Sequence, residues 1–499
     1  MTQPDLSRRL SAQDAAFLYF EREEAPMHIG SVAVFEGAVP FDKFVQNIES
    51  KLHLIPRYRQ RVIDAPLNVS YPTWEFDPEF DIANHVKQVR IDAPGTEAQL
   101  SELAARLFAG RLGRDKPLWE MYLVQGLEGP RSAAVSRVHH CLVDGVSGIE
   151  LLMVVLDVSA NPPPPPPPSE PYAPPPIPGA AIRLVDAFWD GLAEALETGA
   201  ELQRRLLDGL ENGAAARNVT RALEAATPYL FTPMTPAPFN GPFSGERKLA
   251  WSDYSFAEVR AIRANCGGTV NDVVLAVLGG ALSRYLEMHG QATSERAMRV
   301  LTPVNVRRED ERGALGNRIS MLLVEVPVGV RDPIERLKMV NERTEALKRA
   351  NAADGLYILG RLTGNVPSPV QALLGSLPTP PNTLANMVCT NVPGPMIPLY
   401  TVGHRMVAHY PMIPIAWQMG IGCGVTSYDQ RLYFGLMADA KAAADVDRLK
   451  DFLDQSYVEM RSAAGVAATD LPEMAREAAQ RPRRRAATAT GEALAADAS

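Results

Sequence analysis

The sequence contains few cysteines, and none of them are spaced for a metal site or a disulfide framework. Cys141, Cys266, Cys389 and Cys423 lie far apart in 499 residues, with no CxxC pair. This spacing excludes a zinc ribbon and suits a reducing cytoplasm. There is no run of roughly 18 apolar residues. The N-terminus also lacks an apolar core of signal-peptide length. We therefore expect neither a transmembrane helix nor a secretion signal.

An excess of positive charge is also absent. Lys and Arg number 50 against 58 for Asp and Glu, a net charge of −8, which argues against a general nucleic-acid binder. The hydrophobic share of 46% and the charged share of 22% are ordinary for a globular protein. Because 499 residues exceed what one core comfortably holds, we expect two domains.

A proline run provides the clearest boundary. Pro162 to Pro168 are consecutive prolines within residues 161–179. Proline lacks an amide hydrogen, so this segment should be an extended linker without helix or central strand. The alternative is that this segment is a proline-rich ligand of an SH3-type domain. We predict an α/β domain at 8–160, a helical crossover at 180–239, a second α/β domain at 240–465 and a disordered tail at 466–499.

The crossover has an apolar stripe at helical spacing. Leu184, Phe188 and Leu192 recur every four residues, which predicts an amphipathic helix. Such a stripe should pack on a core, and a role facing lipid is the second interpretation. The tail carries Arg481, Arg483, Arg484 and Arg485. These charges could bind anionic lipid, or the tail could simply be solvated.

Two adjacent histidines follow a predicted hairpin. Residues 119–127 and 132–140 are expected to be strands joined by the turn EGPR, so His139 and His140 lie at a strand end. A neutral imidazole there can accept a proton, for example from an attacking alcohol. An adjacent pair is also compatible with a structural role. A metal site would need a third strong ligand, and the other histidines show no HExxH spacing, so we expect no metal.

The next residues predict a loop that opens into a helix. Ser147 and Glu150 have capping-box spacing, and residues 151–156 are apolar, as in a buried helix. Asp144 could hold the loop or bias the imidazole tautomer, and Gly145 permits close approach of the backbone to a ligand.

The motif HHCLVDG at 139–145 is similar to the HHxxxDG motif of the CoA-dependent acyltransferase superfamily, which also occurs in condensation domains. The surrounding chain resembles the bacterial wax ester synthase/diacylglycerol acyltransferase (WS/DGAT) family in particular. The elements that carry this resemblance are LSAQDAAFLYFEREEAPMHIG, PRYRQRV, WEFDPEFDIANHV, PLWE, Asn271-Asp272, PVNVR, GNRIS, NVPGP and SYDQRLYFG, in family order over about residues 8–465.

The resemblance implies two chloramphenicol-acetyltransferase-like α/β domains with an active-site tunnel between them. It implies that His140 is the general base that deprotonates an acceptor alcohol, with His139 in support and Asp144 mainly structural. Gly145, Asn271 and Arg307 would help to bind substrate, with Arg307 also a candidate partner for Asp144. Asn271 could instead be a helix N-cap. Family members have an Asn in the glycine-rich stretch before the SY element, whereas this chain has GIGCGVTSY at 420–428. The resemblance therefore leaves the local lining of the channel, and with it the acceptor preference, open.

The function implied is transfer of an acyl group from acyl-CoA, a co-substrate, to diacylglycerol or a long-chain alcohol. No metal or organic cofactor is expected. We expect a cytoplasmic enzyme, with association at the inner membrane face or at lipid droplets left open. The alternatives are a condensation-type acyltransferase with another acceptor and a lipid-droplet or lipid-binding protein without catalysis.

Overall fold

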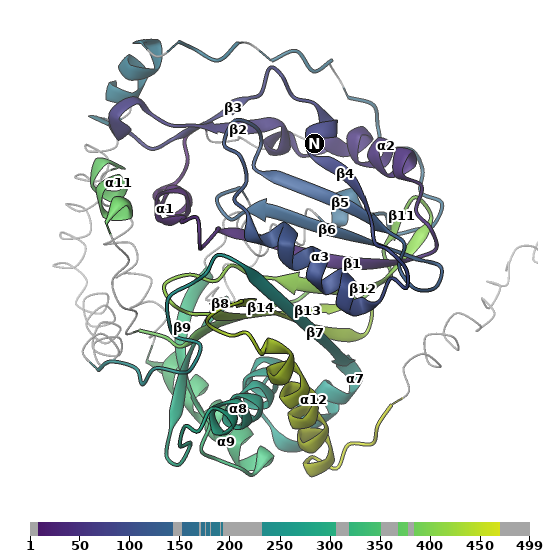
Figure 1. The fold of residues 1–499 in the computed structure, drawn as a ribbon, viewed down its shortest axis with the longest axis vertical. Helices are drawn as coiled ribbons and strands as arrows, with labels where there is room; N and C mark the ends of the chain where they lie inside the picture. The colour runs from purple at the N-terminus through teal and green to yellow at the C-terminus, as the bar shows by residue number, and fades with distance from the viewer. Residues whose placement is uncertain are drawn as a thin grey trace, which may run out of the picture.

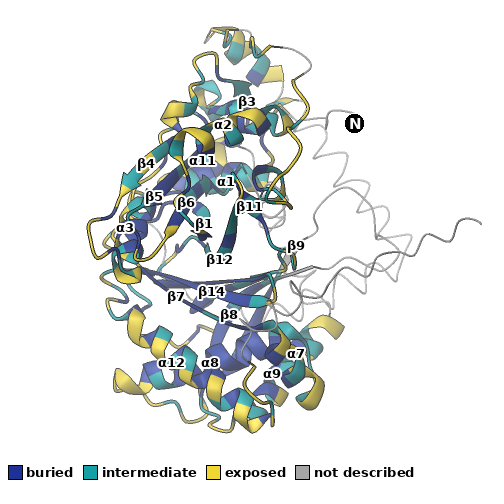
Figure 2. Cartoon of the chain, turned by 90° about the vertical axis from the view of Figure 1, so that its right-hand side faces the viewer, coloured by how far each residue is buried: buried dark blue, intermediate teal, exposed yellow. Residues whose placement is uncertain are grey.

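Two six-stranded sheets form the centre of the molecule. The computed structural model describes residues 8–142, 152–168, 171–174, 176–179, 181–189, 191–192, 232–305, 319–350, 368–377 and 384–469. One sheet lies above the other, and helices cover them (Figure 1). Figure 2 shows the second sheet almost edge-on above its helices. The predicted mixed α/β, two-domain fold class is confirmed.

The first sheet has the strand order β11-β12-β1-β6-β5-β4. Its N-terminal strands are β1 (His28–Glu36), β4 (Val86–Arg90), β5 (Trp119–Gln125) and β6 (Arg131–His139). Along β1, Val32 packs in one apolar cluster and Ala33 in another, the two-residue period of a strand buried on both faces. Helix α2 (Phe41–Lys51) covers one face and α3 (Glu97–Ala109) the other.

The second sheet has the order β7-β14-β13-β10-β8-β9. These strands are β7 (Arg247–Ser255), β8 (Ala297–Asn305), β9 (Ile319–Pro327), β10 (Met387–Val392), β13 (Ile421–Tyr428) and β14 (Arg431–Asp439). Its outer layer contains α7 (Phe256–Cys266), α8 (Val270–Met288), α9 (Pro333–Arg349) and α12 (Val446–Ala463). Helix α8 is buried along most of its length and packs in the centre of this core.

The second half of the chain contributes two strands to the first sheet. Strands β11 (Tyr400–Thr401) and β12 (His404–Met412) belong by sequence to the predicted domain 240–465, yet they complete the first sheet. Strand β12 pairs antiparallel with β1 from Gly30 opposite Met412 to Phe35 opposite Met406. The predicted boundary therefore describes chain order rather than two separable sheets.

Smaller elements lie at one end of the first sheet. Helix α1 (Ala12–Phe20) precedes β1, and β2 (Gln60–Ile63) pairs with β3 (Thr73–Phe76). Four 3-10 helices connect the strands here: η1 (Leu52–Leu54), η2 (Pro56–Arg59), η3 (Pro66–Asn68) and η4 (Ile82–Asn84). Helix α11 (Ser368–Ser376), from the second half of the chain, packs on α1.

The proline segment contains neither helix nor strand in its described residues, as predicted. It is anchored by Tyr172, whose hydroxyl donates to Asp77 O at 2.7 Å while the Arg59 guanidinium lies over its ring. Residues 181–189 and 191–192 are helical, and we call them the crossover helix. The prediction that its stripe packs on a core is wrong, because Leu184, Phe188 and Leu192 are exposed.

The predicted hairpin is present as β5 and β6, which pair antiparallel and place His139 at the end of β6. The Ser147–Glu150 capping box lies outside the described residues. Residues 152–155 are helical, but Met153 is exposed, so this helix is only partly buried. No single described helix is long and apolar enough to cross a membrane. Only α7 and α8 taken together reach that limit, and they are bent by 97° at their junction.

Candidate active site

The backbone amides of His139 and His140 are both hydrogen-bonded to neighbouring segments of the chain. His139 N donates to Leu118 O at 2.9 Å, and His140 N donates to Met27 O at 2.8 Å. His139 also lies directly opposite His28 on β1. The end of β6 is thus fixed to both neighbouring strand segments, which positions the two imidazoles.

His140 is the more accessible of the pair. Its residue is half-buried, one position beyond β6. The imidazole stacks on the Phe17 ring of α1, with 4.0 Å between centroids and 13° between planes. The stack fixes the ring plane while leaving the residue in partial contact with solvent.

His139 faces inward. Its ring is buried, and Nδ1 accepts a hydrogen bond from Cys141 N at 3.2 Å. The ring proton of the neutral form is therefore assigned to Nε2, which lies 3.4 Å from Glu21 Oε1. This arrangement orients His139 as a support for the strand end rather than as a group that meets substrate.

A buried carboxylate, Glu21, lies behind the histidines. Its Oε1 accepts from Met27 N at 3.2 Å, and Oε2 lies 3.5 Å from Arg114 Nη2. Burial alone would raise the pKa of Glu21, but the hydrogen bond and charge of His139, with the Met27 amide, lower it to about 2. The site therefore contains a permanent negative charge next to His139, and His139 lies between this charge and His140 in the chain of contacts.

His28 completes the buried group. Its Nε2 accepts from Leu112 N at 3.2 Å and lies 3.8 Å from Glu21 Oε1. Burial, assisted by the positive charge of Arg137, lowers the pKa of His28 to about 3. His28 is therefore a neutral acceptor that fixes the 107–114 segment beside the site.

The neutrality of His28 predicts an acid-sensitive fold. The unfolded chain protonates this imidazole below its ordinary pKa of 6.5, whereas the folded chain does so only near 3, so stability falls as pH drops through this window. The expected slope is about 1.4 kcal/mol per pH unit. His28→Gln keeps an acceptor for Leu112 N and should remove that share of the slope. Urea unfolding at a series of pH values measures it, and an unchanged slope would contradict the prediction.

The preceding strands are tied together by a second ionic group. Arg137 of β6 pairs with Glu120 of the PLWE element at 2.7 Å and donates to Gly110 O at 2.6 Å. Lys116 also contacts Glu120, at 3.0 Å. Burial opposes ionisation of Glu120, but the Tyr122, Arg137 and Lys116 hydrogen bonds hold its pKa well below the usual range. This group fixes β6 two residues before the histidines.

Of the other predicted site residues, the structure describes only Asn271. Asp144, Gly145 and Arg307 fall outside the described residues. Asn271 is the second residue of α8, in the helical layer of the second sheet. The alternative that Asn271 is the N-cap is wrong, because Thr269 caps α8 and Asp272 closes the capping box. Its substrate-binding role stays a prediction. No group of metal-ligating side chains occurs in the part of the chain that the structure describes.

Sequence reasoning missed Glu21, Phe17 and the role of His28. All three lie in the segment that carries the family resemblance, but three nearby glutamates, Glu21, Glu23 and Glu24, look equivalent in the sequence. Only burial separates Glu21 from the other two, which are exposed. The sequence signal that could have pointed to this group was the position of acidic residues just before the PMHIG element at 26–30.

Comparison with known proteins now decides the family. A sequence profile described as "Wax ester synthase/diacylglycerol acyltransferase catalytic domain" matches residues 10–274, and the "WS/DGAT C-terminal domain" matches residues 315–461. The chain belongs to the WS/DGAT family. It is therefore an acyltransferase, and the resemblance seen in the sequence is confirmed.

Relatives agree with this assignment. A Mycobacterium tuberculosis protein named "Probable diacyglycerol O-acyltransferase tgs1" is 31% identical over 448 residues, covering 88% of this chain and 93% of that protein. The WS/DGAT of Marinobacter aquaeolei has a similar fold, with a TM-score of 0.61, 23% identity and coverage of 92% and 100%. The first condensation domain of the calcium-dependent antibiotic synthetase shares the fold more distantly, with a TM-score of 0.57, 16% identity and coverage of 93% and 98%.

Proposed function

We propose that this WS/DGAT-family enzyme esterifies diacylglycerol or a long-chain alcohol with an acyl group from acyl-CoA, and that His140 is the general base. The observation that carries the proposal is the position of His140, a half-buried residue whose ring stacks on Phe17 just beyond the end of a strand. Its neighbour His139 faces the buried anion Glu21. One imidazole thus belongs to a half-buried residue just beyond β6, while the other lies buried against Glu21.

The reaction requires no covalent acyl-enzyme. The unprotonated ring nitrogen of His140 takes the hydroxyl proton of the acceptor as its oxygen attacks the thioester carbonyl carbon. The tetrahedral intermediate collapses with cleavage of the C–S bond. The CoA thiolate then receives the proton from the imidazolium, which yields an ester and free CoA and returns His140 to its neutral state.

The remaining roles are part of the same proposal. Asn271 would help to position substrate or the developing oxyanion, and Gly145 would allow close approach of the backbone. Asp144 would hold the motif loop, with Arg307 as its partner. Acyl-CoA and the acceptor would reach His140 through a tunnel between the two halves. The enzyme would act in the cytoplasm, at the inner membrane face or at lipid droplets.

An acceptor panel tests the function. Purified protein is mixed with a long-chain acyl-CoA and either diacylglycerol, a long-chain alcohol, or an aminoacyl thioester as the acceptor of a condensation-type enzyme. We expect one free CoA thiol for each ester formed with one or both alcohols. Amide formation alone would indicate the condensation-type alternative, and binding of diacylglycerol without any turnover would indicate a lipid-binding protein.

A further inference from the structure

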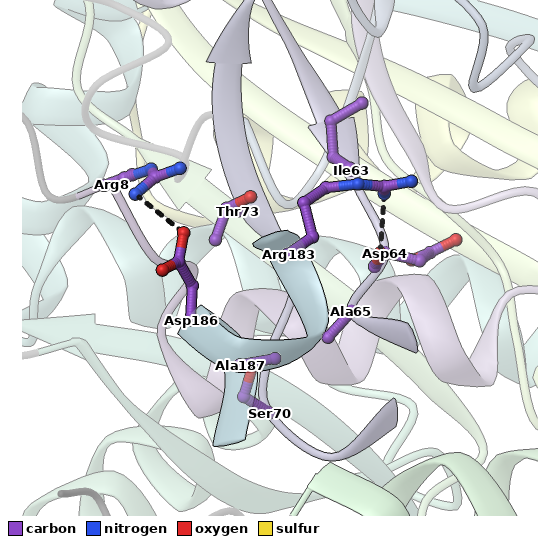
Figure 3. Close-up of a pocket in the computed structure, with 9 residues that line it drawn as sticks. All are labelled: Arg8, Ile63, Asp64, Ala65, Ser70, Thr73, Arg183, Asp186 and Ala187. Carbon is purple, nitrogen blue, oxygen red and sulfur yellow. Dashed lines mark hydrogen bonds and ion pairs between the residues drawn. The ribbon is translucent and has the colours of Figure 1, made fainter. Parts of the chain in front are cut away.

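The crossover helix packs with its polar side inward. Ala187 is its buried position, Arg183 donates to Asp64 O at 3.4 Å, and Asp186 lies 4.0 Å from Arg8 (Figure 3). Its large apolar side chains point outward: Ile182, Leu184, Val185, Phe188, Trp189 and Leu192 are 41% to 62% exposed. An amphipathic helix on a protein core normally has the opposite orientation.

Helix α11 repeats this inverted orientation. Its buried residues are Ser368, Gln371 and Gly375. The Ser368 hydroxyl donates to Ser70 O at 2.8 Å and lies 2.8 Å from the Tyr19 hydroxyl. The apolar residues of this segment are outward, with Val370, Leu373, Leu374 and Leu377 from 43% to 60% exposed. Two helices from distant parts of the chain thus present apolar sides in the same unusual way.

The two helices meet at the turn between β2 and β3. Gly191 approaches this turn so closely that a Cβ there would lie 2.7 Å from Val69 O. Helix α11 contacts η3 in the same turn. At its tip Leu67 is 85% exposed and has a φ of 56°, a conformation that leucine rarely adopts. Leu67 and the exposed residues of both helices together form what we call the apolar face.

Among the described residues, the charges beside the apolar face are of both signs. Arg8, Arg22 and Arg183 border it, and Asp64, Glu75 and Asp186 lie among them. Such a rim favours neither a strongly anionic nor a strongly cationic partner. The mixture of Trp, Phe and branched aliphatic side chains suits the boundary between lipid headgroups and acyl chains.

The apolar face is one helix away from His140. Helix α11 packs on α1, and Arg22, just after α1, donates to Leu377 O at 2.7 Å. The opposite contact of α1 is made by Phe17, which stacks on the His140 ring. Helix α11, which forms one part of the apolar face, and the His140 ring thus both contact α1.

We propose that the apolar face docks the enzyme on a lipid surface with neutral headgroups, from which the acceptor alcohol is taken. The orientation toward an acceptor rests on the proposed function, whereas the docking itself does not. Phe188 and Trp189 are the principal anchors, because aromatic side chains bury the most area at such a boundary. Leu67 and α11 supply the second side of the contact.

Flotation with phosphatidylcholine vesicles tests the docking on the full chain, without any enzyme assay. The double variant Phe188→Ser, Trp189→Ser should bind vesicles about tenfold or more weakly than the wild type. Both side chains are mostly exposed, so folding should be unchanged by circular dichroism. Val458→Ser is the matched control, because Val458 is 50% exposed on α12, in the opposite helical layer, and should bind like the wild type.

A second measurement locates the contact. The chain has five tryptophans, and vesicles with brominated acyl chains should quench Trp189 in particular, so Trp189→Phe should lose most of the quenching while it still binds. Vesicle binding that is equal in the double variant and the wild type would overturn the proposal. The proposal would also be overturned if the wild type bound no vesicles but self-associated, and the double variant lost this self-association. Turnover of a dispersed short-chain alcohol, unchanged in the double variant, separates loss of docking from loss of catalysis.

Discussion

Replacing His140 with alanine should lower the rate of acyl transfer by about 10² to 10⁴-fold, the usual contribution of a positioned general base. The loss should appear in kcat, because the imidazole acts on the acceptor proton rather than on the binding of acyl-CoA. The residue is half-buried at the end of β6, so the variant should remain folded. Ester formation from acyl-CoA and diacylglycerol measures the rate.

The control for this substitution is His289→Ala. His289 follows α8 and pairs with Asp445 at 3.0 Å in the helical layer of the second sheet. Its removal should leave turnover unchanged. Added imidazole should restore part of the activity of His140→Ala, since the space of the lost ring can hold it. Wild-type turnover by His140→Ala would exclude the proposed mechanism.

Glu21→Gln should reduce kcat by about 10 to 100-fold with little change in the KM for acyl-CoA. Glu21 does not meet substrate. It is a positioning residue that acts through His139, whose Nε2 lies 3.4 Å from its Oε1. An amide of the same shape keeps one acceptor but removes the negative charge, and loss of such a supporting partner typically costs this factor. Steady-state kinetics separate the two parameters.

The same carboxylate should make a measurable contribution to stability. Its pKa in the fold is about 2 against an ordinary 4.5, so the ionised form stabilises the fold above about pH 4.5 and that gain is lost as pH falls toward 2. The shift corresponds to about 3 kcal/mol. Glu21→Ala should therefore lower the free energy of unfolding by about 3 kcal/mol near neutral pH, since Arg114 and His139 lose their partner.

Glu24→Gln is the control for both predictions. Glu24 is exposed, so this substitution should change neither kcat nor stability. An unchanged kcat in Glu21→Gln would refute the positioning role.

Local patterns in the sequence predicted the local structure well. The hairpin of β5 and β6 follows from the composition of its two strands and from the turn residues between them. The cap of α8 was misplaced by two residues, because Asn271 and Thr269 are both good caps and only the structure shows which side chain accepts from the Asp272 amide.

Features that depend on contacts between distant parts of the chain could not be predicted from the sequence. The stripe at Leu184, Phe188 and Leu192 shows that the crossover helix is amphipathic, but helical spacing cannot tell which side faces the protein. The insertion of β12 beside β1 was equally hidden, since a strand's composition does not name its partner. The same limit applies to Glu21, whose role depends on burial created by α1 and β6 together.

The shared ladder between β1 and β12 restricts how the enzyme can move. Its register runs without a break from Gly30 opposite Met412 to Val34 opposite Ala408, and the backbones of the two halves are hydrogen-bonded across it. A motion that pulled β12 away from β1 would have to break several of these bonds at once, each worth about 1 kcal/mol net. Any hinge between the two sheets must therefore leave β11 and β12 with the first sheet and act through residues 393–399 and 413–420, which join these strands to the second sheet.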